Sequence, residues 1–137
     1  MKLQLREPSW AEKRDSLRLE LEFPVSYRTI SSTLGLIKKK SKPMNGMMRK
    51  PSTRGLRLLT AAAIPAGTTV QITLDMTRLG LDRSYEILGD VVWTDHSTKT
   101  DGFEQGIALR KSGPDTTHWQ AYIMDCLRRS DQVWRGI

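Results

Sequence analysis

The chain has 137 residues, of which 38% are hydrophobic and 27% charged, and its formal net charge is +7 at pH 7. This length suits one domain with one core, and the composition excludes global disorder. The excess of lysine and arginine favours a partner that carries phosphate or carboxylate groups. The chain has one cysteine and two histidines, which excludes an intrachain disulfide and makes a structural zinc site or a Cys/His nucleophile pair unexpected.

The first fifteen residues have no uninterrupted apolar core and no small-residue cleavage site. We therefore expect no secretory signal. Because no apolar run approaches the length of a membrane span, we also expect a cytoplasmic protein with no span. In domain terms, we expect an N-terminal arm over 1–13, a single domain over 14–130 and a C-terminal tail over 131–137.

The stretch 17–30, LRLELEFPVSYRTI, alternates apolar and polar residues. Period two predicts a strand of an antiparallel sheet with one face toward the core. The next stretch, 31–49, contains a run of lysines, two glycines and three methionines. This composition predicts a basic insertion loop with little structure of its own.

Alternation returns further along the chain and predicts four more strands, over 55–62, 68–76, 84–96 and 103–112. In the stretch 84–96 the pattern places Trp93 on the core face, together with Val91. Residues 114–134 change to helical spacing and predict an amphipathic C-terminal helix. Thr117 and Gln120 fit a capping box near the start of that helix.

Five or six short antiparallel strands followed by one helix predict a mainly β fold, a small barrel plugged or flanked by the helix. Strands and helices do not alternate along the chain, so a doubly wound nucleotide-binding sheet is not expected. The sequence contains no GxSxG, P-loop, HExxH or CxxC motif. Asp95 and His96 adjoin at a strand end, where a turn is the simpler interpretation. We therefore expect no enzymatic activity.

Two basic clusters are candidate anion sites. Arg14 and Arg18 lie four residues apart just where the first strand begins. Two guanidiniums at this spacing offer forked donors to phosphate oxygens, and each plane can stack on a purine. Residues 50–55, KPSTRG, have the composition of a turn, yet they lie among Arg49, Lys50 and Arg54. From residues alone this stretch is either a corner before a strand or a cradle for an anion.

Several of these features together resemble the PilZ family, small bacterial domains that bind cyclic di-GMP. Members carry an RxxxR motif before the first strand and a [D/N]xSxxG motif that leads into a later strand. The first motif is similar to RDSLR, Arg14 to Arg18, and the second to KPSTRG, Lys50 to Gly55. PAGTTVQITLDM, ILGDVVW and GIALR also resemble family segments, so the resemblance spans roughly residues 14–127.

The resemblance implies a six-stranded antiparallel β-barrel followed by a C-terminal α-helix. It also implies a non-catalytic receptor for cyclic di-GMP in bacterial second-messenger signalling, with no metal and no further cofactor. The nucleotide would bind between the RxxxR segment and the KPSTRG turn. The ligand-binding residues would then be Arg14, Arg18, Ser52 and Gly55, with Arg49 and Lys50 beside them.

Lys50 departs from the family pattern, which has an acid or amide at that position. A carboxylate or amide accepts hydrogen bonds from guanine, whereas an ammonium only donates, although it can still pair with a phosphate or with guanine O6 and N7. The alternative is therefore a PilZ-like domain that does not bind nucleotide and acts as a protein–protein adaptor. An unidentified protein partner is expected in either case. Nucleic acid is not expected, because the aromatic residues leave few stacking platforms on the strands.

Overall fold

Alternating segments form strands here, and the one segment with helical spacing forms the α-helix. The structure is a computed structural model, and it describes residues 18–33, 37–98, 100–111 and 113–136. The elements are β1 (Glu22–Thr33), β2 (Ile37–Lys40), β3 (Met44–Arg49), β4 (Gly55–Thr60), β5 (Thr69–Asp75), the 3-10 helix η1 (Met76–Leu79), β6 (Ser84–His96), β7 (Phe103–Leu109) and α2 (Gly113–Gly136).

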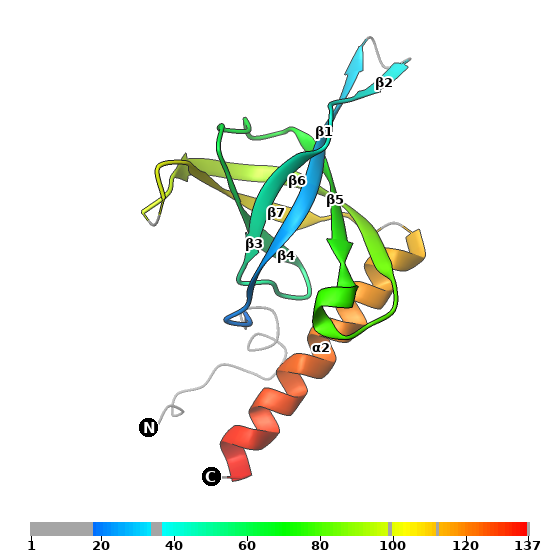
Figure 1. The fold of residues 1–137 in the computed structure, drawn as a ribbon, viewed down its shortest axis with the longest axis vertical. Coiled ribbons are helices and arrows are strands. Elements are labelled where there is room, and N and C mark those ends of the chain that lie inside the picture. Colours follow the sequence, from blue (N-terminus) through cyan, green and yellow to red (C-terminus); the bar gives the residue numbers. More distant parts are fainter. Residues whose placement is uncertain (1–17, 34–36, 99, 112, 137) are drawn as a thin grey trace.

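Six of the strands close into an antiparallel barrel. They are hydrogen-bonded in the order β1–β3–β4–β7–β6–β5, and β5 pairs with β1 to complete the circle. β2 lies outside the barrel and pairs with β1 alone (Figure 1). The prediction of a mainly β fold, a six-stranded antiparallel barrel with a C-terminal helix, is confirmed.

β1 is long because it changes neighbours along its length. β3 pairs with its first half and β2 with its last four residues, while β5 pairs with the middle of β1 on the other side. β2 and β3 therefore form the returning arm of one long hairpin. The prediction of a basic insertion loop over 31–49 is wrong, because β2 and β3 lie within that stretch. β2 escaped the sequence analysis because it lies outside the barrel and needs no alternation of apolar residues. β3 escaped it because only its last two residues, Met48 and Arg49, are buried.

The core fills the barrel and extends onto α2. The alternation in β1 points Phe23, Val25 and Tyr27 inward, as predicted, and the other strands contribute buried aliphatic side chains. Trp119 and Ile123 of α2 are fully buried against the same core, so the helix closes one end of the barrel. The start of α2 lies against the start of β6, where the backbone N–H of Glu86 donates to Asp115 Oδ2 at 2.9 Å.

Helix α2 begins at Gly113, four residues before the predicted capping box. Gly113 has φ 82°, a left-handed conformation that glycine adopts without steric cost. Gln120 consequently lies inside the helix, where its side chain donates to Thr53 O at 2.7 Å. The helix continues to Gly136, so most of the predicted tail is helical. Among the described residues, no helix is both long and apolar enough to cross a membrane.

Candidate functional site

Three arginines surround a shallow hollow on the outside of the barrel. The hollow has a volume of about 220 Å³ and lies beside the turn that leads into β4, facing β6 and β7. It is lined by Arg18, Arg54, Gly55, Leu56, Arg57, Val92, Trp93, Gly106, Ile107 and Ala108. The lining therefore combines guanidinium groups, an indole ring and exposed main chain, which suits a planar anionic ligand.

Arg18 connects the predicted arginine motif to the KPSTRG turn. Its Nη1 donates to Lys50 O at 3.0 Å, across 32 residues of sequence. Partial burial lowers the pKa of Arg18, and the nearby positive charge of Arg57 lowers it further. A guanidinium whose charge is disfavoured by desolvation and by a like charge gains most from an anion. Arg14, the other member of the predicted motif, lies outside the described residues.

The KPSTRG turn is closed by Ser52. Its hydroxyl accepts from the backbone N–H groups of Arg54 (3.3 Å) and Gly55 (3.2 Å) and donates to Gly55 O (3.3 Å). The backbone N–H of Ser52 also donates to Gly55 O, at 2.8 Å. Ser52 is fully buried, so its hydroxyl shapes the turn. We had expected it to donate to a ligand, and the buried position does not offer that contact.

Gly55 is required by the approach of β4 to β7. A Cβ atom at this position would lie 2.2 Å from Ile107 O, which is backbone and cannot move aside cheaply. The residue therefore sets the floor of the hollow through its lack of a side chain. The turn is tethered from two further sides, by Leu19 N–H, which donates to Pro51 O at 3.0 Å, and by the side chain of Gln120.

Lys50 is the one non-glycine residue with positive φ among the described residues, at 48°. Asparagine and aspartate tolerate this left-handed conformation far better than other side chains. Its backbone N–H donates to Leu21 O at 3.2 Å, while its carbonyl receives the bond from Arg18. Hydrogen bonds to its backbone N–H and carbonyl thus hold residue 50 in the left-handed conformation. Asparagine or aspartate would adopt this conformation more readily than lysine.

Arg49 points into an ion-pair network and away from the hollow. Its Nε donates to Glu22 and its Nη1 to Glu104, each at 2.8 Å, and only 7% of its side chain is exposed. The hydrogen bond that Arg49 donates to Glu22 and the charges of both carboxylates raise the pKa of Arg49. We had placed Arg49 among the ligand-binding residues, but its guanidinium already satisfies two carboxylates.

Trp93 was predicted on the core face, and this prediction is wrong. The register of β6 against β7 shifts by one residue between Val91 and Trp93, which makes Val92 the extra residue of a β-bulge. After the bulge the side-chain parity is reversed, so Trp93 is 40% exposed and Val92 56% exposed. The indole of Trp93 packs directly over Gly106, where a Cβ atom would lie 2.2 Å from Nε1. A glycine within the strand was therefore the one sign of this arrangement in the sequence.

The indole of Trp93 lies against Arg57. The guanidinium carbon is 5.8 Å from the ring centroid, within cation–π range, and Arg57 Nη1 is 3.9 Å from Glu104. Arg57 and Trp93 were absent from the predicted site. Together with Arg18 and the Ser52 turn, they complete the hollow.

A scan against protein-family models, a search of curated proteins and a search of solved structures each found no match for this chain.

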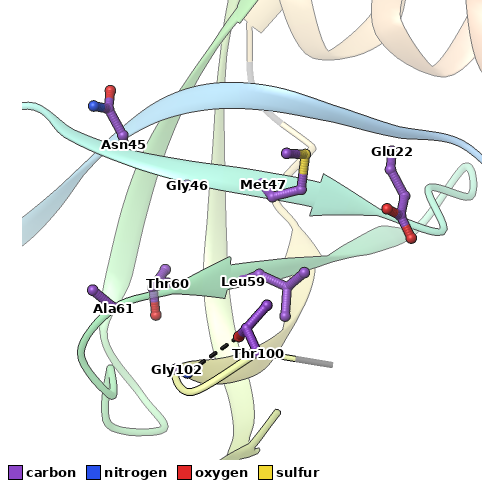
Figure 2. A pocket seen from close by; sticks show the side chains of 9 residues that line it. All are labelled: Glu22, Asn45, Gly46, Met47, Leu59, Thr60, Ala61, Thr100 and Gly102. Carbon is purple, nitrogen blue, oxygen red and sulfur yellow. Dashed lines mark hydrogen bonds between the residues drawn. The ribbon is translucent and has the colours of Figure 1, made fainter. Parts of the chain in front are cut away.

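A larger cavity of about 500 Å³ lies elsewhere on the barrel wall, between β3, the end of β4 and the turn after β6. Figure 2 shows Asn45 and Glu22 at its two ends and Met47 and Leu59 between them. Glu22 is the only charged residue among those that line it, and its carboxylate is paired with Arg49. This mainly apolar cavity does not suit an anion, and no predicted site residue lines it.

In the described part of the chain, no group of three histidine, cysteine, aspartate or glutamate side chains is placed to hold a metal ion. The ring of His96 packs on Phe103, 4.8 Å between centroids, and its backbone N–H donates to Asp95 Oδ1 at 2.8 Å. These contacts suit the end of a hairpin. The arginines and the indole ring around Arg18 are suited to binding an anion.

Proposed function

We propose that this chain is a PilZ-like, non-catalytic receptor for cyclic di-GMP, and that the nucleotide binds at the hollow between Arg18 and the KPSTRG turn. The observation that carries the proposal is the 3.0 Å hydrogen bond from Arg18 Nη1 to Lys50 O. It brings together the two segments on which the family resemblance rests. They are separated by 32 residues of sequence, so their contact is a property of the fold.

The charge at the hollow supports a phosphate ligand. Among the described residues, Arg18, Arg54 and Arg57 line it and no carboxylate does. Burial lowers the pKa of Arg18, and the positive charge of Arg57 lowers it further, so an anion beside Arg18 would favour its charged form. A cyclic dinucleotide carries two phosphate charges, so its binding would relieve the repulsion between Arg18 and Arg57.

The planar groups at the hollow support a nucleotide in place of a simple anion. Guanine bases stack well on guanidinium planes and on indole. Trp93 and Arg57 already lie near each other at the rim. Drug-sized ligands occupy pockets of roughly 300–1,000 Å³, so a hollow of about 220 Å³ would hold one base and a phosphate. The resemblance assigns further contacts to Arg14.

Isothermal titration calorimetry with cyclic di-GMP tests the proposal. Arg18→Ala and the double variant Arg14→Ala/Arg18→Ala should lose most or all of the binding heat. Lys111→Ala is the matched control, because Lys111 is an exposed cation outside the hollow. If the wild-type protein gives no heat above dilution at high micromolar ligand, the proposal fails.

One observation favours a second candidate, a PilZ-like adaptor that binds a protein without nucleotide. Lys50 supplies no acceptor for guanine, and the Ser52 hydroxyl is used up inside its own turn. An adaptor of this kind would recover the same partner protein in a pull-down with and without cyclic di-GMP. A receptor would recover it in only one of the two conditions.

A further inference from the structure

The net positive charge of the chain comes from one continuous region that has no acidic residues. No aspartate or glutamate occurs between Glu22 and Asp75, and nine of the 22 lysines and arginines lie in that interval. The interval contains most of β1, all of β2, β3 and β4, and all of β5 except Asp75. Arg49, Arg54 and Arg57 of this set belong to the barrel wall described above. A separate group of lysines lies at the two-stranded ribbon outside the barrel, which is called the arm below.

The arm is a two-stranded ribbon made of the last four residues of β1, Ile30–Thr33, and β2. It projects away from the barrel, at the end opposite α2 (Figure 1). Four residue pairs at about 3.4 Å each give a ribbon roughly 13 Å long. Lys39 and Lys40 are exposed on it, and Lys42 is exposed just after the end of β2. Within the described part of the chain, none of the ion pairs involves these lysines.

The lysines lie on both faces of the ribbon. Lys39 pairs with Ser31 and Lys40 with Ile30, and paired residues of antiparallel strands share a face. Because successive side chains alternate, Lys39 and Lys40 point to opposite faces. A flat anionic surface such as a membrane would engage one face at a time. A groove with phosphates on both walls would engage both.

We propose that this arm binds duplex DNA by entering the major groove, without sequence preference. The major groove of B-DNA is about 12 Å wide and admits a two-stranded β-ribbon. Lys39, Lys40 and Lys42 would contact phosphates on the two walls. We had not expected nucleic acid as a partner, because the barrel strands lack stacking platforms. Phosphate contacts by a ribbon do not need them.

The proposal does not depend on cyclic di-GMP, because the arm and the hollow share no residue. It is tested without nucleotide, by fluorescence anisotropy with a labelled random-sequence duplex of about 20 base pairs at several salt concentrations. Three phosphate contacts predict that binding weakens by about 40-fold between 50 and 200 mM KCl. The variant Lys39→Gln/Lys40→Gln/Lys42→Gln should reduce the slope of log K against log salt by about 2.7.

The matched control is Lys111→Gln/Arg128→Gln/Arg129→Gln, which removes the same charge from exposed positions far from the arm in sequence. It should leave the slope unchanged. A duplex RNA of equal length should bind more weakly, because the A-form major groove is too narrow for a ribbon.

Three outcomes would overturn the proposal. The first is equal loss of DNA binding in the arm variant and the control, since the effect would then be one of net charge. The second is binding of the wild type to anionic vesicles but not to the duplex at 50 mM salt. The third is an unchanged DNA affinity in the arm variant, in which case the lysines serve only to keep the exposed edge of β2 from pairing with other strands.

Discussion

The guanidinium of Arg18 donates a 3.0 Å hydrogen bond to the backbone carbonyl of Lys50, a residue in the left-handed conformation. This contact joins the start of the described chain to the KPSTRG turn. It also places the guanidinium of Arg18 beside Arg57 at the rim of the hollow. The residue that presents its carbonyl to Arg18 is therefore also the residue that departs from the family pattern.

Lys50→Asn should improve both stability and nucleotide binding. Asparagine tolerates a φ of 48° better than lysine and offers guanine an acceptor. We expect the free energy of unfolding in urea to rise by about 0.5–1 kcal/mol and cyclic di-GMP affinity to rise about tenfold. Lys50→Val is the contrasting variant, because a β-branched residue fits this conformation worst. Lower stability of Lys50→Asn than of Lys50→Val would contradict this explanation.

Ser52→Ala should lower stability because it removes the acceptor of two backbone N–H groups inside a buried turn. Leaving buried donors unpaired costs about 1–3 kcal/mol, measurable as a shift of the urea midpoint. The neighbouring variant Thr53→Ala is the control and should stay within about 0.5 kcal/mol of wild type. Equal stability of both variants would mean that the Ser52 hydroxyl does not hold the turn.

Substitutions of Arg49 and Arg57 should affect different properties. The first should lower stability, and the second should weaken nucleotide binding. Arg49→Met leaves Glu22 and Glu104 without their buried partner and should cost about 3 kcal/mol of stability. Its effect on nucleotide affinity should be small. Arg57→Met removes an exposed, long ion pair worth at most about 1 kcal/mol, yet it should weaken nucleotide binding about tenfold or more.

Denaturation and calorimetry on the two variants give the comparison. If Arg49→Met abolishes binding in a protein that is still folded, Arg49 reaches the ligand and the network is not its main role.

Asp90 and Arg110 predict part of the acid sensitivity. Arg110 donates to both carboxylate oxygens of Asp90 at 2.9 Å, and this hydrogen bonding lowers the pKa of Asp90. A lowered pKa in the folded state stabilises the protein above about pH 4 and stops doing so as the pH falls through the folded value. Asp90→Asn should therefore be less stable than wild type at pH 7 and lose less stability on acidification. Parallel stability curves from pH 7 to 3 would contradict this.

Much of the barrel could be predicted because its strands face water on one side and the core on the other. That alternation is visible in 17–30 and in the four later strands. It does not give the strand order, because β4 pairs with β7 and β1 with β5, and these strands are far apart in the sequence. β2 was missed because it lies outside the barrel and buries no core face, so lysines are tolerated at successive positions and the pattern of a strand is lost. β3 was missed because only its last two residues are buried, which is too few to show alternation.

The candidate site was only half predictable. Arg18 and the turn could be found from their motifs, yet motifs do not show which polar atoms are already bonded. Ser52 and Arg49 have their donors occupied by Gly55 and by two carboxylates, and these partners are set by tertiary packing. Trp93 reaches the site only because of the bulge at Val92, which one extra residue creates and no period reveals.

An NMR titration of ¹⁵N-labelled protein with cyclic di-GMP up to about 1 mM detects even weak binding at the Arg18 hollow. We expect shifts of the backbone signals of Gly55 and Gly106 and of the Trp93 indole N–H. Signals of Thr100 and Gly102, at the larger cavity, should stay in place. No shifts, or shifts confined to the larger cavity, would contradict nucleotide binding at the Arg18 hollow.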